Sequence, residues 1–274
     1  MKNIIKNTKK TIAITLSLLF GLNLQAQVPT GENLDFSTGG YQFWQAKTGI
    51  YDGNSSQAIF NWTTSLPDPT QASDAGGRLF EVFNSGTDSY SAGQLSRVPE
   101  GFTHASQINN AYGGTNCSQL QYTMEVNLEN CLLTFMYAMV LESPGHSNYE
   151  NPTFQIDIMK HSPDNGAMLE ELVDACAFFE KSSNTQLPTT EPGVWHTSAT
   201  NSSWIWSNWQ QIKINLARYI GDRVTIRVRL GDCSFSAHGA YGYFTAKAEP
   251  ALINTPGCAG NGDTVTVASA NGLK

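Results

Sequence analysis

The segment 210–230 constrains the fold more than any other part of the chain, because hydrophobic and polar residues alternate along it twice. The hydrophobic positions are Ile212, Ile214 and Leu216 in the first stretch and Val224, Ile226, Val228 and Leu230 in the second. Such period-two alternation is typical of antiparallel strands that place one face on a hydrophobic core. Residues 219–222 join the stretches, and a glycine-rich segment ending in Tyr241, Tyr243 and Phe244 follows. The pattern predicts the closing strands of a two-layer antiparallel sandwich.

Four further segments are predicted to form strands. They are residues 34–49, a strand–turn–strand opening with Phe36, Phe43 and Trp44 as core candidates; residues 78–83; residues 119–126 with Leu120, Tyr122, Met124 and Val126 inward; and residues 153–159 with Phe154, Ile156 and Ile158 inward. Residues 131–141 are apolar on both faces, as in a central strand covered on both sides. The 24 glycines suit tight turns. We therefore predict an all-β fold, a two-layer antiparallel β-sandwich of jelly-roll type, over residues 27–250.

Two segments fit the alternation less well. Residues 50–75 are rich in Ser, Thr, Asn and Pro without a clear period, and we predict a surface loop there. Met168, Leu172, Cys176 and Phe179 have helical spacing, which favours a short helix, although residues 177–179 could equally continue a strand. For this second segment we predict a loop or helical turn followed by a strand near residues 174–181.

The N-terminus has the pattern of a secretory signal peptide. Four lysines within the first ten residues precede an apolar stretch over residues 11–24, and residues 24–26 are suited to cleavage before Gln27. The apolar stretch is short for a membrane span, so an uncleaved anchor is the weaker alternative. We predict a signal peptide over residues 1–26 and a protein that is secreted or displayed at the cell surface.

Charge limits the partners of the exported chain. Removing residues 1–26 takes away four lysines and no acidic residue, which moves the formal net charge from −7 to −11. An acidic chain of this kind is poorly suited to nucleic acid or to an anionic membrane surface. We expect neither of these as the main partner, and no membrane span after cleavage.

The C-terminal segment 251–274 resembles the start of another domain. Residues 256–262 read as a linker, and residues 263–268 alternate as a strand would. A lone edge strand buries too little surface to be stable. We predict that the chain is a fragment continuing into downstream Ig-like or PKD-like β-domains; the alternative is that this strand folds back onto the sandwich.

Five cysteines remain after export, and an oxidising compartment permits disulfides. Their spacings do not include a CxxC pair, which argues against a zinc ribbon or a thioredoxin-like site. We predict a Cys176–Cys233 disulfide first and a Cys117–Cys131 disulfide second. Several free buried cysteines are the alternative, and Cys258 is left without a partner in this scheme.

A catalytic motif is not evident. The GxSxG, HExxH, GxGxxG, P-loop and EF-hand patterns do not occur in the sequence. Glu170, Glu171 and Asp174 cluster, but acidic runs on loops are usually solvated charge rather than a paired acid and base. We therefore expect no enzymatic activity.

Four polar residues follow two of the predicted strands and suggest a metal site. Glu142 and His146 come after the strand 131–141, and Asp232 and His238 come before the last strand. If those strands are neighbours, the four side chains converge. Carboxylates suit Ca²⁺, whereas the two histidines suit zinc or copper better. The alternative is that both histidines only hydrogen-bond to loop backbone.

A group of tryptophans suggests a sugar-binding surface. Trp195, Trp204 and Trp206 are interleaved with Ser, Asn and Thr, and flat rings beside polar groups can stack on the C–H faces of sugars. Trp204 and Trp206 share a face by period two, so they are exposed together or buried together. Burial in the core is the alternative for this pair, and it is our expectation for Trp209.

Three segments carry a resemblance to a known group of proteins. They are NLDFSTGGYQFWQAKTG (33–49), YAMVLESPGHSNYENPTFQIDIM (137–159) and WQQIKINLARYIGDRVTIRVRLGDCSFSAHGAYGYF (209–244). Together with the signal peptide, they resemble the N-terminal β-sandwich module of Bacteroidetes surface proteins that continue into PKD or Ig-like repeats. The strand order also resembles the MAM and galactose-binding-like jelly rolls. The resemblance implies an interaction module and says little about a ligand.

These observations predict a non-enzymatic extracellular interaction or adhesion module whose partner is a glycan or surface polymer. A carbohydrate-binding module is the first alternative, and it requires an exposed Trp204 and Trp206 pair. A secreted hydrolase is the second, and it requires a cleft where acid and base residues converge.

Overall fold

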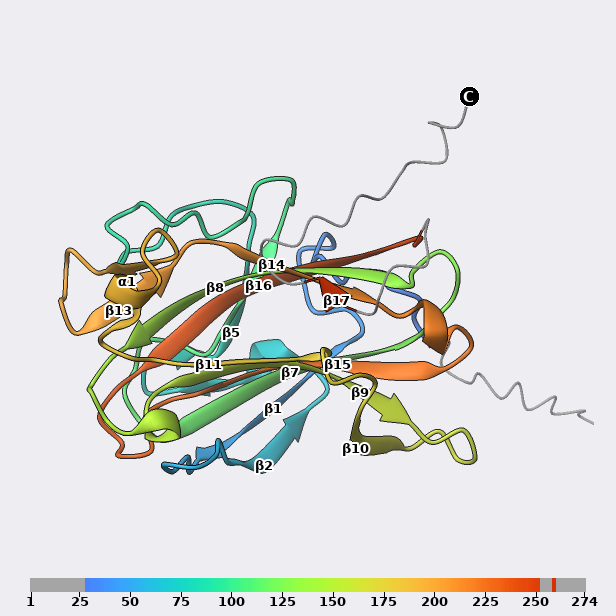
Figure 1. Cartoon of the computed structure of the whole chain (residues 1–274), viewed down its shortest axis with the longest axis horizontal. Coiled ribbons are helices and arrows are strands. Elements are labelled where there is room, and N and C mark those ends of the chain that lie inside the picture. The colour runs from blue at the N-terminus through green and yellow to red at the C-terminus, as the bar shows by residue number, and fades with distance from the viewer. Residues whose placement is uncertain (1–27, 252–257, 260–274) are drawn as a thin grey trace, which may run out of the picture.

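The computed structural model of the chain describes residues 28–251 and 258–259. Two antiparallel β-sheets pack face to face in this part of the chain (Figure 1). A small two-stranded ribbon of β3 (Ser73–Asp74) and β4 (Gly77–Arg78) and short helical turns decorate the layers. The predicted all-β jelly-roll sandwich is therefore confirmed.

Sheet 1 is the lower layer in Figure 1. Its strands, in spatial order, are β10 (Met168–Leu172), β9 (Thr153–His161), β15 (Arg223–Gly231), β7 (Asn116–Glu125), β1 (Trp44–Tyr51) and β2 (Phe60–Leu66), and β11 (Phe178–Ser182) also pairs with β9. All of these pairs are antiparallel. The strands from the second half of the sequence thus lie on one side of this sheet and those from the first half on the other, and β15 and β7 join them in the middle.

Sheet 2 is the upper layer. Its strands, in spatial order, are β12 (Trp195–Thr197), β13 (Trp204–Ser207), β8 (Leu132–Glu142), β16 (Ala240–Glu249), β6 (Ala105–Ile108) and β5 (Phe80–Phe83), while β14 (Gln210–Asn215) pairs with both β8 and β17 (Cys258–Ala259). The helical turns are η1 (Pro69–Gln71), η2 (Asn148–Glu150), α1 (Leu187–Thr190) and η3 (Ala217–Tyr219).

The main core lies between the two sheets and is built from the alternating residues. The inward residues predicted for residues 119–126, 153–159 and 223–230 are all buried in it: Leu120, Tyr122, Met124, Val126, Phe154, Ile156, Ile158, Val224, Ile226, Val228 and Leu230. Phe36 stacks on Trp44 at 5.0 Å between ring centroids, and the Trp44 indole donates a hydrogen bond to the Asn33 carbonyl. Each buried side chain of this size contributes roughly 1.5–3 kcal/mol to folding.

A second apolar cluster lies on the outer face of sheet 2. As predicted for residues 131–141, β8 is covered on both sides, because Ala138 and Val140 face this cluster while their neighbours face the main core. The residues of the outer cluster are Leu95, Ala138, Val140, Trp204, Trp206, Tyr241 and Tyr243. The loop 84–104, drawn in teal above the upper layer in Figure 1, covers it with Leu95 and Tyr90.

Several sequence-based predictions about elements were wrong. Residues 50–75 contain β2, a full edge strand, because Phe60 and Trp62 alternate with exposed polar residues. The loop or helical turn predicted before residue 174 is instead strand β10, whereas the strand predicted near residues 174–181 is found as β11, and both strands pair with β9. Phe43 is 43% exposed rather than buried, because its φ of 69° turns its side chain away from the core.

The predicted Cys176–Cys233 disulfide does not form, and both cysteines are free. Cys176 lies beside Ile158 of β9, because the Ile158 amide donates a hydrogen bond to the carbonyl of the next residue, Ala177. Cys233 lies at the other end of β9, because Gly231, two residues before it, pairs with Thr153. Five residues of β9 separate these places, about 16 Å at the rise of a strand. A disulfide needs Cα atoms within about 7 Å, so the two cannot be joined.

The predicted Cys117–Cys131 disulfide is also not formed. Cys117 lies near the start of β7 opposite Gly231, while Cys131 lies past the other end of that strand, just before β8. Both side chains are buried, and burial raises the pKa of the Cys117 thiol to about 12. Of the five cysteines, the alternative of several free buried thiols holds for Cys117, Cys131 and Cys233, while Cys176 is free and exposed.

The predicted signal peptide and the predicted strand over residues 263–268 lie outside the described residues. Within residues 28–251 and 258–259, no helix is long and apolar enough to cross a membrane.

Candidate functional site

The outer face of sheet 1 carries two rows of polar side chains. They stand on the non-core positions of four adjacent strands, β1, β7, β15 and β9, and we call them the polar face. Its residues are Gln45, Lys47, Gln119, Gln121, Gln155, Asp157, Arg227 and Arg229. Because alternate residues of a strand point to opposite faces, the same alternation that builds the core also builds this face.

The first row runs across the strands through Arg229. Cross-strand pairing places Gln119 on one side of Arg229 and Gln155 on the other, with Lys47 beyond Gln119. Gln155 donates a hydrogen bond to Glu180 of β11, and Glu180 is therefore the last residue of the row on this side. The row therefore presents amide, guanidinium and ammonium groups in register.

The second row runs through Arg227. Its guanidinium bonds to both oxygens of Asp157 at 2.6 and 3.2 Å and reaches Glu170 at 3.0 Å, while Arg229 also binds Asp157. Gln121 lies on the other side of Arg227 and donates to Gln45 at 2.9 Å. Burial lowers the pKa of the Arg229 guanidinium, and the neighbouring Asp157 opposes that shift.

Three polar atoms of the first row have no hydrogen-bond partner among the described residues. They are Oε1 of Gln119, Oε1 of Gln155 and Nε of Arg229, and all three are buried. Buried polar atoms without a partner are uncommon in native proteins, and a bound molecule or ordered water is one way in which they are satisfied. Because Gln119 and Gln155 are themselves buried, these atoms lie beneath the accessible part of the polar face.

Aromatic side chains border the polar face at the β1–β2 edge of the sheet. Tyr51, Phe60 and Trp62 form this aromatic edge, with ring centroids 5.2 Å apart for Tyr51 and Phe60 and 5.6 Å apart for the stacked Phe60 and Trp62. A β-bulge at Thr48 and Gly49 shifts the register between the two strands. The shift turns Phe60 and Trp62 outward, whereas Leu66 of the same strand packs on the core.

Side chains from distant strands meet over the polar face. Two strands, β1 and β7, separate Phe60 of β2 from Arg229 of β15, which is about 14 Å across a flat sheet. The Arg229 guanidinium nevertheless lies 5.1 Å from the centre of the Phe60 ring, because both side chains extend toward each other over β1 and β7. We call the strip of sheet 1 between the polar rows and the aromatic edge the trough.

Gly231 makes room for the aromatic edge. A Cβ atom there would lie 2.3 Å from the Tyr51 ring, so a side chain at this position is incompatible with the observed packing. The Tyr51 hydroxyl then donates to the Tyr149 carbonyl at 2.7 Å and to Thr153 Oγ1 at 2.9 Å. The ring is thus held over the end of β15.

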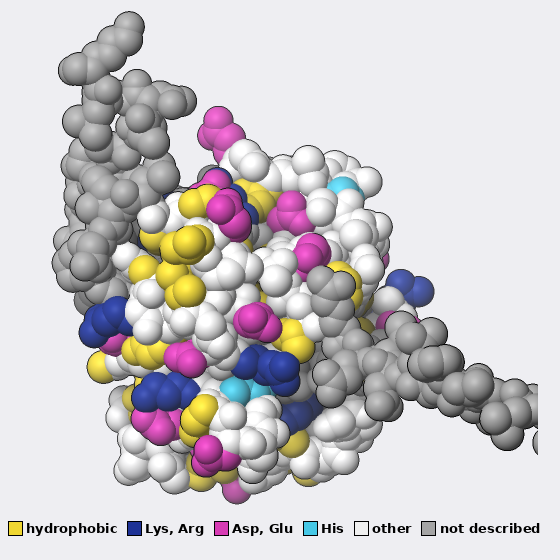
Figure 2. Space-filling view, turned by 90° about the vertical axis from the view of Figure 1, so that its right-hand side faces the viewer, with side chains coloured by type: hydrophobic (Ala, Val, Ile, Leu, Met, Phe, Trp, Pro, Cys, Tyr) yellow, Lys and Arg dark blue, Asp and Glu magenta, His cyan; other side chains and the backbone are white. Residues whose placement is uncertain are grey.

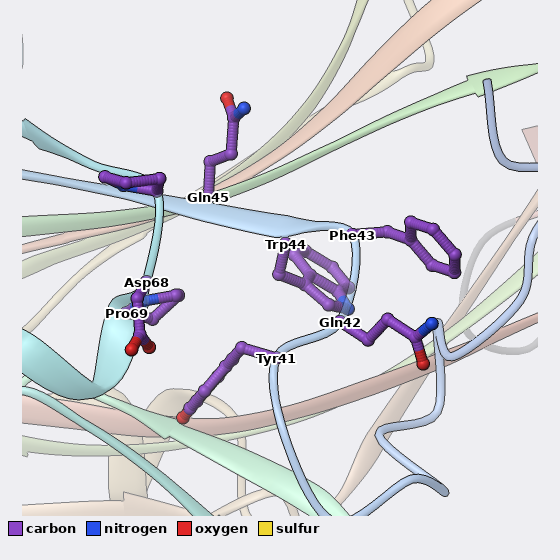
Figure 3. A pocket seen from close by; sticks show the side chains of 8 residues that line it. Tyr41, Gln42, Phe43, Trp44, Gln45, Asp68 and Pro69 are labelled. Carbon is purple, nitrogen blue, oxygen red and sulfur yellow. The ribbon is translucent and has the colours of Figure 1, made fainter. Parts of the chain in front are cut away.

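A depression continues from the polar face around the end of β1. A cavity of about 240 Å³ is lined by Gln45, Lys47 and Gln121 together with residues 65–67, and a second of about 420 Å³ adjoins it at Gln45 and Pro67. Figure 3 shows the second cavity, where Gln45 and Trp44 leave β1 on opposite sides. Gln45 therefore links the trough to this depression.

The predicted sugar-binding tryptophans are not on the surface. Trp195, Trp204 and Trp206 are 2%, 2% and 3% exposed. Trp195 packs in the main core, while Trp204 and Trp206 share a face as expected but are covered by the loop 84–104. The prediction of an exposed platform is therefore wrong for these residues. The same face-sharing argument applies to Phe60 and Trp62, which are partly exposed.

The four predicted metal-site residues lie at one end of the sandwich, but they do not form one group. His146 and His238 approach each other, with ring centroids 5.4 Å apart. Glu142 instead accepts hydrogen bonds from Ser203 and from the Gly239 amide, both at 3.1 Å. Asp232 is fully buried and accepts from Asn109 and from the Ala240 amide.

Burial strongly affects Asp232. Desolvation raises the pKa of its carboxyl well above the ordinary value, against the opposing effect of its hydrogen bonds to Ala240 and Asn109. Through its hydrogen bonds to the Ala240 amide and to Asn109, the Asp232 carboxyl stabilises the connection between β15 and β16. Both carboxylates therefore have structural partners in the described part of the chain.

Surface charge is mixed. On the side of the molecule shown in Figure 2, basic and acidic side chains lie next to one another rather than in patches of one sign. The arginines of the polar face are likewise paired with Asp157 and Glu170. This distribution differs from the continuous basic stripe of a nucleic-acid surface.

Comparisons with known proteins show similarity of fold only. No protein-family model matches the sequence, and neither does any curated protein. Among solved structures, the TmCBM61 module in complex with β-1,4-galactotriose is 12% identical, with 80% of this chain and 97% of that chain covered and a TM-score of 0.35.

Two further solved structures are similar at the same level. The family 11 carbohydrate-binding module of Clostridium thermocellum is 10% identical, with 76% of this chain and 98% of that chain covered and a TM-score of 0.30. The CBM22-1 xylan-binding domain of Paenibacillus barcinonensis Xyn10C is 12% identical, with 82% and 99% covered and a TM-score of 0.28. The ligand class has to come from the side chains of the polar face and the aromatic edge.

Proposed function

We propose that this chain is a carbohydrate-binding module that works outside the cytoplasm and holds an extended glycan in the trough of sheet 1. The observation that carries this proposal is the polar face, where Gln45, Gln121 and Arg229 remain at least partly exposed on the same side of the sheet as the partly exposed Trp62. Binding sites for small molecules combine apolar contact area with a few fixed polar groups, and this face offers both.

The chemistry of the face suits sugars. A sugar ring has apolar C–H faces that stack on aromatic rings and hydroxyl groups that both donate and accept hydrogen bonds. Amide groups donate and accept, guanidinium groups donate in pairs, and carboxylates accept in pairs. Neighbouring hydroxyls of one sugar can therefore bond to Gln45, Gln121 or Arg229 in turn.

The internal pairing of charge favours a neutral ligand. Asp157 lies between Arg227 and Arg229, and Glu170 adds a second carboxylate to Arg227. An anionic ligand would have to displace these carboxylates. Binding of a neutral polysaccharide leaves them in place, and it would also serve adhesion to a glycan-coated surface.

The same pairing bears on the secreted-hydrolase alternative. Glycoside hydrolysis needs two carboxyl groups, one able to give a proton and one facing it across the substrate. Asp157 is engaged by two arginines, and Glu170 by one. These contacts support a role in positioning rather than in proton transfer.

The test is retention in affinity gels that contain soluble β-1,4-galactan, xylan or mixed-linkage β-1,3-1,4-glucan. Wild-type protein is expected to be retarded by at least one polymer, and Trp62→Ala is expected to weaken binding by about 30-fold, the equivalent of about 2 kcal/mol for an aromatic anchor. Gln45→Ala, at the junction of the trough and the depression, should weaken it by a smaller factor.

The controls are matched in residue type. Tyr112→Ala removes an aromatic side chain that is 48% exposed in a different loop, and Gln57→Ala removes an exposed glutamine. Both should bind as the wild type does. Equal retention of all five proteins, or cleavage of a polymer that Asp157→Asn abolishes, would refute the proposal.

A further inference from the structure

Two loops meet at the end of the sandwich, away from the polar rows. One joins β8 to β9 over residues 143–152, and the other joins β15 to β16 over residues 232–239. The Ser234 amide donates to the Glu150 carbonyl at 3.2 Å, which ties the loops together. The contact brings residues from distant parts of the sequence into one cluster.

The cluster consists of His146, Cys233 and His238. One potential ligand atom of each lies within 4.8 Å of the other two, and in the described part of the chain this is the one such group of three. Cys233 is fully buried, whereas the two histidines are half-buried. Nε2 of His146 and Nδ1 of His238 are buried and lack hydrogen-bond partners among the described residues.

The backbone around each side chain is fixed. The Asn151 side chain accepts from the His146 amide at 3.0 Å and donates to the His146 carbonyl at 2.8 Å. The Cys233 amide donates to the His238 carbonyl at 3.1 Å, and the Phe235 amide points at the Cys233 sulfur at 3.3 Å. An amide directed at sulfur stabilises a thiolate, and such outer contacts orient metal ligands.

The donor set selects the class of metal. Two imidazoles and one thiolate are soft or borderline ligands, which suit zinc and copper, whereas Ca²⁺ prefers six or more oxygens. Neither Glu142 nor Asp232 belongs to the group of ligand atoms that lie within 4.8 Å of one another, so the cluster does not offer those oxygens. The chemistry at this end of the sandwich therefore differs from that of a calcium site.

We propose that His146, Cys233 and His238 bind a zinc ion, with the fourth tetrahedral position left to water or an external ligand. Zn–N distances of about 2.0–2.1 Å and a Zn–S distance of about 2.3 Å place the donors of a tetrahedral site roughly 3.3–3.6 Å apart. Small rotations of the half-buried imidazoles bring the three donors from their present separation to that spacing. The proposal does not depend on the glycan trough, although the loop 143–152 also contacts the aromatic edge, where the Tyr51 hydroxyl donates to the Tyr149 carbonyl.

The experiment uses the purified chain after chelator treatment, kept reduced with a phosphine. Titration with Zn²⁺ against a chromophoric competitor should give one ion per chain. Titration with Co²⁺, which has visible absorption, should give a thiolate-to-cobalt charge-transfer band and the intense bands of a four-coordinate ion. Cys233→Ser should remove the charge-transfer band, and His238→Ala should lower the Zn²⁺ affinity by at least about 100-fold.

Two controls address binding elsewhere. Cys176→Ser removes an exposed free thiol, and His104→Ala removes a half-buried histidine from a different loop; neither should change stoichiometry or spectra. Circular dichroism should show that Cys233→Ser and His238→Ala remain folded. The proposal is overturned if Co²⁺ gives no charge-transfer band, if Cys233→Ser and His238→Ala bind Zn²⁺ as the wild type does, or if only Cu⁺ is bound.

Discussion

A single buried carboxylate, Asp88, should hold the loop 84–104 on the outer cluster of sheet 2. One oxygen of Asp88 accepts hydrogen bonds from the hydroxyls of Tyr241 and Tyr243, at 2.6 and 2.9 Å. The other oxygen accepts a hydrogen bond from the Ser91 amide at 2.9 Å, so both carboxylate oxygens have hydrogen-bond partners. We therefore predict that Asp88→Ala destabilises the protein far more than a typical loop substitution.

The magnitude follows from the two tyrosine contacts. A hydrogen bond to a charged group contributes about 1.5–3 kcal/mol, so Asp88→Ala should cost about 3–6 kcal/mol, and Tyr241→Phe or Tyr243→Phe about 1.5–3 kcal/mol each. A typical domain is stable by only about 5–15 kcal/mol. Urea denaturation followed by tryptophan fluorescence measures these losses, since Trp204 and Trp206 lie beneath the loop.

Limited proteolysis separates local opening from global unfolding. Arg97 lies in the loop with its guanidinium over the Phe83 ring, and trypsin can cleave there once the loop lifts. If the loop opens locally in Asp88→Ala, cleavage at Arg97 should accelerate by more than about 100-fold, the equivalent of about 3 kcal/mol. Unchanged cleavage and an unchanged urea midpoint in this variant would refute the anchoring role of Asp88.

Three other perturbations have definite expected outcomes. Gly231→Ala should destabilise the protein by about 1–3 kcal/mol in urea through the clash with the aromatic edge, whereas Gly40→Ala, where a Cβ meets nothing within 4 Å, should be neutral. Asp157→Ala should lower stability by about 3–5 kcal/mol in calorimetry, because it leaves Arg229 unpaired and leaves the buried Arg227 with only the exposed Glu170; a loss below 1 kcal/mol would contradict this. Burial and the nearby Asp88 raise the pKa of Tyr241 and of Tyr243, so the folded state holds their protons while unfolded tyrosines ionise near pH 10. Stability should therefore fall as pH rises above about 10, and the Tyr241→Phe/Tyr243→Phe double variant should show a shallower fall.

The core strands could be predicted from sequence because their signal is local. Each of β7, β9 and β15 alternates along its own residues, so no information about neighbours is needed. The prediction of a loop or helical turn was wrong for β10, because the spacing there fits a helix while pairing with β9 decides the structure; the strand predicted near residues 174–181 is present as β11. The disulfides failed for a related reason, since the distance between two cysteines depends on strand order and not on their separation in sequence.

The candidate site was harder to predict. The outward residues Arg227 and Arg229 were visible as the polar half of an alternating strand, a pattern that is equally typical of an ordinary solvated face. Only the strand order reveals that Gln119 and Gln155 flank Arg229. The tryptophan-rich segment 195–206 suggested a sugar-binding surface more strongly than the single Trp62 did. Its residues Trp204 and Trp206 are buried because the loop 84–104 covers them, and the sequence around the tryptophans does not indicate that loop. The histidine pair was predicted, whereas its third member, Cys233, was assigned to a disulfide instead.

The polar face stands on β1, β7, β9 and β15, and this has a practical consequence for finding its ligand. The groups that would touch a glycan are carried by the same strands whose opposite sides form the main core. Unfolding of the domain therefore destroys the site. A ligand that occupies the site binds only the folded state, so it opposes unfolding by a free energy that grows with ligand concentration. An oligosaccharide at 100 times its dissociation constant would add about 2.7 kcal/mol. Thermal melting in the presence of a sugar library can thus identify the ligand even when each individual sugar binds only weakly.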